Sequence, residues 1–215
     1  MSITRRDILA ATTGLGISGL ATGALLLSRR QGASVKPTPD AMIDQALHDP
    51  DNPVLGNQQG ALTVAEYFDY QCPYCKMGHA MLSRVVRDEG DIRLVMKDWP
   101  ILGAPSVLAS QLVLGAVSMG RYHQAHDALM ATDARLSQDQ IHEVLNAAGI
   151  DPGTALTAYR AERDRWDGLL SRNSAQAAGL GLGGTPVFVI GGTVYPGAMD
   201  ENRLRRAIAE ARGQI

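Results

Sequence analysis

The chain has 215 residues, of which 45% are hydrophobic, and its formal net charge at pH 7 is −2. A chain of this length and composition can bury a full core, so one domain, or one domain with an insertion, is expected for most of it. No lysine or arginine run of the kind that follows phosphates occurs outside the N-terminus, which makes nucleic acid a poor candidate partner.

Residues 1–33 have the features of a targeting segment and are not expected to belong to the fold. Arg5 and Arg6 precede an uncharged stretch from Ile8 to Leu27, an order that resembles the bacterial twin-arginine export signal. The alternative is an uncleaved membrane anchor, because about 20 residues at 1.5 Å each cover about 30 Å of hydrocarbon. Either interpretation predicts a periplasmic or other extracytoplasmic location for the rest of the chain.

The next segments predict a βαβ unit. Residues 34–52 are expected to form a linker and a short helix, since small residues and prolines flank "DAMIDQALHD". "LTVAEYF", residues 62–68, predicts a strand because it is rich in β-formers. Apolar residues at helical spacing then run as far as Gly90, and "IRLVMKDW" predicts a second strand. This order implies a parallel pair with a right-handed crossover.

The pattern is helical from about residue 105 to 178, where Ser137 and Gln140 have the spacing of a capping box. The β signal returns in "TPVFVIGGTVYPG", which predicts two short strands joined by a turn at the paired glycines. "DENRLRRAIAEARG" predicts a final amphipathic helix. The predicted fold class is therefore α/β, with the order βαβ, an inserted helical subdomain, and ββα.

The chain contains only two cysteines, Cys72 and Cys75. A strand that leads into a helix places Cys72 at the helix N-terminus, where unpaired N–H groups and the helix dipole favour a thiolate. Pro73 suits the first turn because it has no N–H group. Cys75 lies about one turn further and can attack the mixed disulfide that Cys72 forms. Two alternatives stay open: half of a zinc site, for which only His79 is near in sequence, and an inert structural disulfide.

Four stretches resemble the DsbA-like family of extracytoplasmic thiol-disulfide oxidoreductases, which have a thioredoxin fold with a helical insertion: "VLGNQQGALTVAEYFDYQCPYCK", "KDWPILG", "GRYHQAHDALM" and "GGTPVFVIGG". The resemblance covers residues 53–213, with the insertion at about 105–178. It implies that Cys72 attacks, that Cys75 resolves, and that the Thr185–Pro186 bond is cis beside them. It also implies that the backbone of Thr185 pairs with a substrate peptide.

The resemblance further implies two kinds of partner, the thiols or disulfides of unfolded or exported proteins and a membrane redox partner that the sequence does not identify. No cofactor and no metal are expected. Glu66 and Lys97 match the family's buried acid–base pair. Glu66 can point inward beneath Cys75, where a buried carboxyl has a raised pKa and can accept the proton of Cys75. Lys97 is expected to pair with Glu66; the alternative is an ordinary solvent-facing pair.

Other residues near the motif allow two interpretations each. His123, His126 and Asp127 could form a metal cluster, yet their spacing suits a polar helix face equally well. Three methionines are expected in the core rather than in a substrate groove: Met77, Met81 and Met96.

Trp99 and Tyr74 are expected on an apolar peptide-binding rim. The strongest oxidants of the family carry histidine where Tyr74 stands here, and a tyrosine brings no positive charge to the Cys72 thiolate. The pKa of Cys72 is therefore expected at roughly 4 to 6, between the values of the strong oxidant and of thioredoxin.

These observations support three hypotheses about function. The first is an exported oxidase that inserts disulfides into unfolded proteins. The second is a reductase or isomerase that a membrane donor keeps reduced, because the direction of exchange depends on potential and partner. The third is a chaperone that holds peptides without turnover. Replacing Cys72 by serine separates the third hypothesis from the other two, and the redox state of the cysteines in growing cells separates the first two.

Overall fold

The structure, a computed structural model, describes residues 38–133 and 135–213. The predicted targeting segment, residues 1–33, lies outside the described residues. Within the described part of the chain, no helix has the length and apolar character that a membrane span requires. The elements follow in this order: α1 (Pro39–His48), β1 (Val54–Gly56), β2 (Leu62–Phe68), α2 (Pro73–Glu89), β3 (Ile92–Asp98), α3 (Ala104–Gly115), α4 (Tyr122–Met130), α5 (Gln138–Ala147), α6 (Pro152–Ala161), α7 (Arg163–Gly179), β4 (Val187–Ile190), β5 (Thr193–Pro196) and α8 (Glu201–Gly213).

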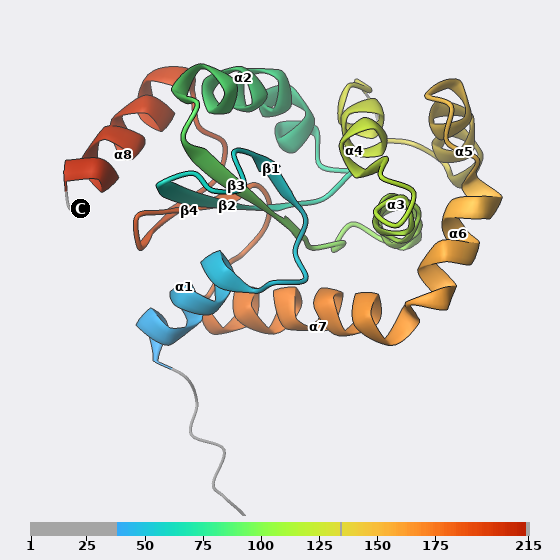
Figure 1. Cartoon of the computed structure of the whole chain (residues 1–215), viewed down its shortest axis with the longest axis horizontal. Helices are drawn as coiled ribbons and strands as arrows, with labels where there is room; N and C mark the ends of the chain where they lie inside the picture. The colour runs from blue at the N-terminus through green and yellow to red at the C-terminus, as the bar shows by residue number, and fades with distance from the viewer. Residues whose placement is uncertain (1–37, 134, 214–215) are drawn as a thin grey trace, which may run out of the picture. The chain divides into compact units, whose positions relative to one another are not determined.

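The strands form one sheet in the order β1-β3-β2-β4-β5 (Figure 1). Strands β2 and β3 are parallel, and the other three neighbouring pairs are antiparallel. The predicted βαβ unit is thus confirmed as β2, α2 and β3, and the ββα unit as β4, β5 and α8. Strand β1 was not predicted, because three residues are too few to show a periodic pattern.

Helices cover both faces of the sheet. Figure 1 shows α2 and α8 on one face, here called the α2 face, and α1 and α7 on the other, here called the α7 face. Each face has its own buried cluster. Val64, Phe68 and Met96 belong to the cluster of the α2 face, and Tyr67 and Val95 to that of the α7 face. Successive strand residues point to opposite faces. Even-numbered residues of β2 and β3 therefore lie on the α2 face, and odd-numbered residues on the α7 face.

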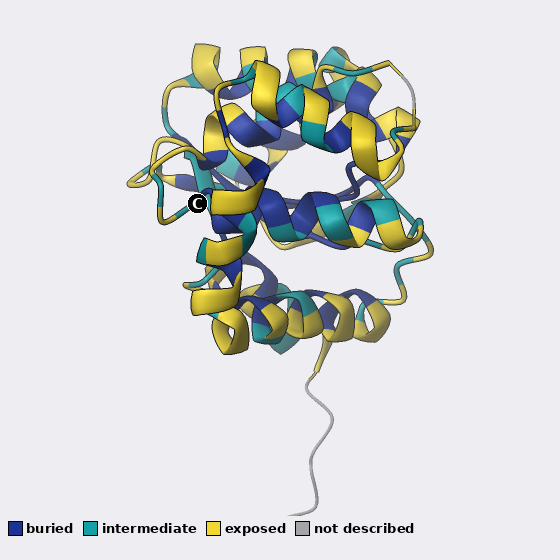
Figure 2. Cartoon of the chain, turned by 90° about the vertical axis from the view of Figure 1, so that its right-hand side faces the viewer, coloured by how far each residue is buried: buried dark blue, intermediate teal, exposed yellow. Residues whose placement is uncertain are grey.

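The predicted helical region is confirmed as five helices, and the capping box of Ser137 and Gln140 is present at the start of α5. Helices α3 to α6 lie beside the sheet (Figure 1), and exposed and buried residues alternate along the helices on this side of the molecule (Figure 2). Their buried side chains, such as Leu112 and Ile141, continue the cluster of the α2 face. Helix α7 instead returns along the sheet and forms part of its cover.

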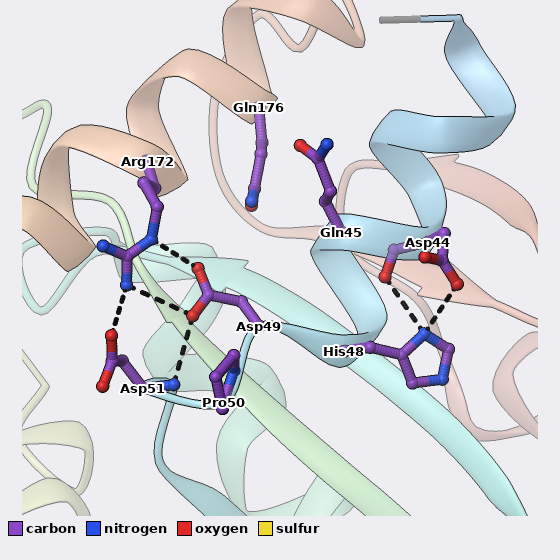
Figure 3. A pocket seen from close by; sticks show the side chains of 8 residues that line it. All are labelled: Asp44, Gln45, His48, Asp49, Pro50, Asp51, Arg172 and Gln176. Atoms are coloured by element: carbon purple, nitrogen blue, oxygen red, sulfur yellow. Dashed lines mark hydrogen bonds and ion pairs between the residues drawn. The ribbon is translucent and has the colours of Figure 1, made fainter.

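Helix α1, which was predicted together with a linker, packs on the sheet through Ala46 and Leu47. An ion-pair network joins the end of α1 to α7 (Figure 3). Arg172 donates to Asp49 at 2.8 Å and to Asp51 at 2.6 Å, beside a surface pocket of about 390 Å³. The short helix is therefore part of the folded unit, because its apolar face completes the α7-face cluster.

Candidate active site

The two cysteines lie where β2 leads into α2. Cys72 is the N-cap residue of α2 and Pro73 is the first residue of the helix, as predicted. Both cysteines are free thiols and are buried, with 4% of Cys72 and 1% of Cys75 exposed. The loop and the first turn of α2 thus hold two thiols side by side at the positive end of a helix dipole.

The two thiols have opposite electrostatic environments. A hydrogen bond from the Cys75 thiol lowers the pKa of Cys72 to about 5, with help from Thr185 and from the backbone N–H groups of Tyr74 and Cys75, against the effect of burial. The same hydrogen bond, followed by burial and the charge of Glu66, raises the pKa of Cys75 well above its usual range. At neutral pH Cys72 is therefore a thiolate and Cys75 keeps its proton, which is the division of roles between nucleophile and resolving thiol.

Glu66 lies on β2 and faces the α2 side of the sheet, with 2% of its surface exposed, which confirms its predicted burial. Burial is the main cause that raises its pKa to about 8, and the negative charge of Cys72 raises it further. Among the described residues, Oε2 of Glu66 has no hydrogen-bond partner. At neutral pH this carboxyl therefore holds a proton close to the cysteine pair.

The predicted pairing of Glu66 with Lys97 is corrected by the register of the sheet. Glu66 lies opposite Met96 on the α2 face, whereas Lys97 lies opposite Tyr67 on the α7 face. Lys97 is fully buried there, with Nζ 5.7 Å from the centre of the Tyr67 ring. When the side-chain amide of Asn52 is turned so that both its oxygen and its nitrogen have hydrogen-bond partners, the oxygen accepts a hydrogen bond from Lys97 Nζ at 2.9 Å. The two side chains are therefore separated by the sheet, and no ion pair joins them.

Burial lowers the pKa of Lys97 to about 7, and the negative charge of Asp49 acts against this shift. Asp49 also belongs to the network that fastens α1 to α7. Lys97 thus serves the packing of the α7 face rather than the cysteines.

The predicted position of Trp99 on a peptide-binding rim is also corrected by the structure. It belongs to the buried α7-face cluster, and its ring packs edge-on against Tyr67 with the ring centres 6.1 Å apart. The alternation of β3 continues through residue 99, which turns this side chain away from the cysteines. Trp99 therefore does not form part of a peptide-binding rim.

Tyr74 and the Thr185–Pro186 segment do line one groove. The Thr185–Pro186 bond is cis, as predicted, and the Thr185 carbonyl oxygen lies 3.2 Å from Cys72 Sγ. Tyr74 is 58% exposed and lines, together with Thr185, Pro186 and Gly197, a groove of about 440 Å³. Because Thr185 lines this groove and contacts Cys72, the groove lies beside the cysteine pair.

The methionines divide between core and surface. Met96 is buried in the α2-face cluster and Met81 packs against it, as predicted. Met77 is 70% exposed and lines a second pocket beside Pro73, so its assignment to the core is wrong. The pocket lies between the start of α2 and the end of α4 and leaves the Met77 side chain open to solvent.

Several buried polar residues near the cysteines, chiefly Tyr70 and Asp98, were not predicted from the sequence. Both are buried on the side of the sheet that holds Glu66. Alternation puts Asp98 on the same face as Met96 within β3, but only the register of β3 against β2 shows that this is also the face of Glu66. His126 lies with them: its Nδ1 is 3.0 Å from the Tyr70 hydroxyl. Asp127 instead points outward and pairs with His123 at 3.1 Å.

Comparisons with known proteins agree with this geometry. A family model described as a DSBA-like thioredoxin domain matches residues 63–209. A thioredoxin-like oxidoreductase from Silicibacter pomeroyi DSS-3 is 34% identical, with a TM-score of 0.75 over 79% of this chain and 97% of that protein. The catalytic domain of Proteus mirabilis ScsC is 28% identical, with a TM-score of 0.73 over 81% of this chain and 97% of that domain.

Curated relatives include the Na(+)/H(+) antiporter NhaA 3 of Salinispora tropica, which is 25% identical over 214 residues. The match covers 95% of this chain but 32% of the antiporter, so the chain spans about a third of the length of this relative.

The thiol-disulfide exchange protein alpha-DsbA2 of Wolbachia pipientis is 25% identical, with a TM-score of 0.73 over 80% of this chain and 95% of that protein. The fold, the paired cysteines and the family match together show that the chain belongs to the DsbA-like thioredoxin-fold family of thiol-disulfide oxidoreductases.

Proposed function

We propose that the chain is an extracytoplasmic oxidase that transfers the Cys72–Cys75 disulfide to the thiols of exported proteins. The observation that carries this proposal is the contrast between the two thiols, because the pKa of Cys72 is lowered to about 5 while that of Cys75 is raised. A thiolate that is stable in the reduced form makes the corresponding disulfide a stronger oxidant.

In the proposed reaction a substrate thiolate attacks Cys72 Sγ, and the bond between Cys72 and Cys75 breaks. Cys75 leaves with the electron pair and takes a proton from Glu66. A second substrate thiolate then attacks the substrate sulfur of the mixed disulfide, and Cys72 leaves as a thiolate. The substrate has lost two electrons and gained a disulfide, while the two cysteines have been reduced. A membrane redox partner accepts these two electrons and restores the Cys72–Cys75 disulfide.

The groove beside Cys72 has features that suit an unfolded polypeptide. It is open, it is lined by the exposed ring of Tyr74, and it contains the backbone of Thr185 and Gly197. A backbone edge recognises an extended peptide through main-chain hydrogen bonds, without a demand for one side chain. The substrate class would then be cysteine-bearing peptides of varied sequence.

An extracytoplasmic location is supported by two observations. The sequence around Arg5 and Arg6 resembles an export signal. A similar structure, 27% identical and with a TM-score of 0.69, is that of a periplasmic thioredoxin-like protein from Salmonella enterica serovar Typhimurium. Disulfides persist in such compartments and are suppressed in the cytosol.

Oxidative refolding tests the proposal directly. The oxidised chain should restore activity to a reduced, unfolded substrate such as ribonuclease, with one disulfide consumed for each disulfide formed. Cys72→Ser should abolish this transfer, whereas Met77→Ser, which changes an exposed residue on the same helix, should not. If Cys72→Ser promotes refolding as well as the wild type when a glutathione redox buffer supplies the oxidant, the chain holds peptides as a chaperone and the proposed oxidase function is wrong.

A further inference from the structure

Asp69, three residues before Cys72, has a buried carboxyl, and each of its two oxygens accepts backbone N–H groups. Only 1% of this residue is exposed. Oδ1 accepts from the N–H of Gln71 at 2.7 Å. Oδ2 accepts from the N–H of Ile101 at 2.8 Å and from that of Leu102 at 2.9 Å. These bonds compensate for the water that the carboxyl loses on burial, but packing alone does not require a carboxyl here, so its presence calls for another explanation.

The carboxyl and the carbonyl group of Asp69 together fix the turn that leads to Cys72. The carbonyl oxygen of Asp69 accepts the N–H of Cys72 at 3.0 Å, which closes a four-residue turn. The bond from the N–H of Gln71 to Oδ1 holds the same turn from within, as aspartate side chains commonly do at this position. Helix α2 begins directly after the turn, at Pro73. The geometry of the turn therefore determines where the Cys72 sulfur lies relative to the helix that carries Cys75.

The bonds to Oδ2 fasten this turn to the loop between β3 and α3. The two segments run side by side, since the N–H of Trp99 donates to the carbonyl oxygen of Phe68 at 2.9 Å. Gly103 ends the loop with a φ of 106°, a conformation that residues with a side chain rarely adopt. Helix α3 follows at once and buries residues such as Leu112. Because packed elements hold both ends of this loop, it gives the turn a fixed support.

The alignment of the two cysteine sulfurs matters most in the second step of exchange. Asp69 contacts both cysteines through its backbone, because it accepts the N–H of Cys72 and forms a backbone hydrogen bond with the Cys75 thiol. In the first attack, one of the reacting sulfurs comes from outside and can adjust its approach to Cys72. In resolution, Cys75 must approach Cys72 within the same chain, so that only the fold can bring the two sulfurs into line.

We propose that Asp69 is a positioning residue that holds the turn before Cys72 against residues 101–102 and thereby aligns Cys72 with Cys75 for resolution. The proposal rests on the part of the proposed function in which Cys75 resolves a mixed disulfide on Cys72. In that step the S–H bond of Cys75 breaks, a bond forms between the two cysteine sulfurs, and the bond from Cys72 to the substrate sulfur breaks. The substrate sulfur leaves with the electron pair and ends with the proton of Cys75. Asp69 takes no part in these bond changes.

Single-turnover kinetics with glutathione disulfide test the proposal, because attack by Cys72 and resolution by Cys75 are separate steps. Asp69→Ala removes all three bonds to the carboxyl. Resolution should slow by about tenfold or more, because a displacement of about 1 Å between reacting groups can cost about 10²-fold in rate. The mixed disulfide with glutathione should therefore accumulate, and mass spectrometry of acid-quenched samples measures it. Attack, compared at a pH at which Cys72 is ionised in both proteins, should stay within about threefold of the wild type.

Asp69→Ser separates the local turn from the support that the loop gives. A serine hydroxyl can accept the N–H two residues further on and so keep the turn. Its single oxygen cannot also accept from the N–H groups of Ile101 and Leu102. Asp69→Ser should therefore slow resolution by a factor close to that of Asp69→Ala, and it provides a second variant should Asp69→Ala fail to fold.

Asp151→Ala is the matched control, because Asp151 also accepts a backbone N–H group, that of Thr154 at 2.7 Å. Asp151 is the N-cap residue of α6, in the helical region. Loss of this cap should lower the free energy of unfolding, which urea unfolding measures for every variant. Both attack and resolution should nevertheless stay within about twofold of the wild type, since α6 contributes no residue to the cysteine site.

The proposal is overturned if Asp69→Ala or Asp69→Ser resolves the mixed disulfide at the wild-type rate. It is also overturned if attack and resolution slow by the same factor, or if Asp151→Ala slows resolution as much, since either result would indicate a general loss of stability. A failure of the proposed function would look different, because the wild type itself would then form the mixed disulfide without resolving it, or would not form it at all.

Discussion

Tyr74 stands between the two cysteines with an exposed ring that brings no positive charge to Cys72. The Cys72 pKa of about 5 lies within the range that the sequence predicted, below that of thioredoxin and above that of the strong oxidant. The reduction potential of the chain should accordingly fall between about −270 and −120 mV. Equilibration with glutathione buffers measures this potential.

Replacing Tyr74 by histidine should make the disulfide more oxidising, because a protonated imidazole would stabilise the Cys72 thiolate. Each 1.4 kcal/mol gained by the thiolate corresponds to about 30 mV, so a shift of about 30 mV or more is expected. Met77→His, which adds a histidine to the same helix outside the motif, should shift the potential much less. A Tyr74→His variant that became more reducing would refute the electrostatic explanation.

Glu66 should make the stability of the fold depend on pH. Burial raises its pKa from 4.5 to about 8, so the native state holds a proton that the unfolded chain releases. The free energy of unfolding should therefore fall as the pH rises from about 4.5 to about 8. Glu66→Gln, which cannot ionise, should be more stable than the wild type at pH 9 by about 2–5 kcal/mol and nearly equal at pH 4. Urea unfolding at both pH values measures the difference, and an equal effect at both would contradict the buried ionisation.

At the scale of elements, Arg172 fastens α1 and the loop after it to α7. Its partner Asp49 is buried, and hydrogen bonds from Arg172 lower the pKa of Asp49 against the effect of burial. Arg172→Met should leave this carboxylate buried without its main partner and should destabilise the fold by about 2–3 kcal/mol at neutral pH. The loss should shrink as the pH falls below about 4, because a lowered pKa contributes stability only while the carboxylate is ionised.

Arg163→Met provides the matched control, since Arg163 is exposed and pairs with the half-exposed Asp167 at 2.9 Å. Exposed pairs contribute about 0.2–1 kcal/mol, so this variant should change the free energy of unfolding little. Equal losses in the two variants, measured by urea unfolding, would show that burial of Asp49 is not the cause.

The elements also show what could be predicted from the sequence. Strand β2 was predicted with the same bounds that the structure shows, because β-formers fill it and Gly60 precedes it. It was harder to predict which side chains of two neighbouring strands point to the same face of the sheet. Lys97 and Glu66 were paired because their sequences matched a family pattern, yet the register of β3 against β2 turns them to opposite faces. Within one strand, alternation determines which side chains share a face of the sheet. Between two strands this also depends on the register, which is set by packing and cannot be read from the local sequence.

At the scale of the whole molecule, the sequence pattern predicts that residues 1–40 direct export. Fused to a passenger protein, this segment should carry the passenger out of the cytoplasm, and the replacement of both Arg5 and Arg6 by lysine should abolish that transport. The same double replacement at Arg29 and Arg30 is the control and should leave transport intact. Transport that survives the loss of Arg5 and Arg6 would mean that the segment is not a twin-arginine signal. Cell fractionation measures the outcome.

The direction of electron flow is a property of the whole molecule together with its partner, because the same two cysteines can donate or accept electrons. The geometry explains why exchange is possible: a low pKa at Cys72, a protonated Cys75 and a groove beside Thr185. Whether the pair rests as a disulfide or as two thiols depends on its reduction potential and on the molecules with which it exchanges electrons.

The central claim, that the chain donates disulfides, is tested most directly by the redox state of Cys72 and Cys75 in growing cells. Acid quenching followed by alkylation with a reagent that adds mass to free thiols separates the two forms on a gel, and Cys75→Ser provides the marker for a chain that cannot form the pair. An oxidase should be found with most molecules in the disulfide form. Molecules found mostly as dithiols would contradict the claim and identify a reductase or isomerase.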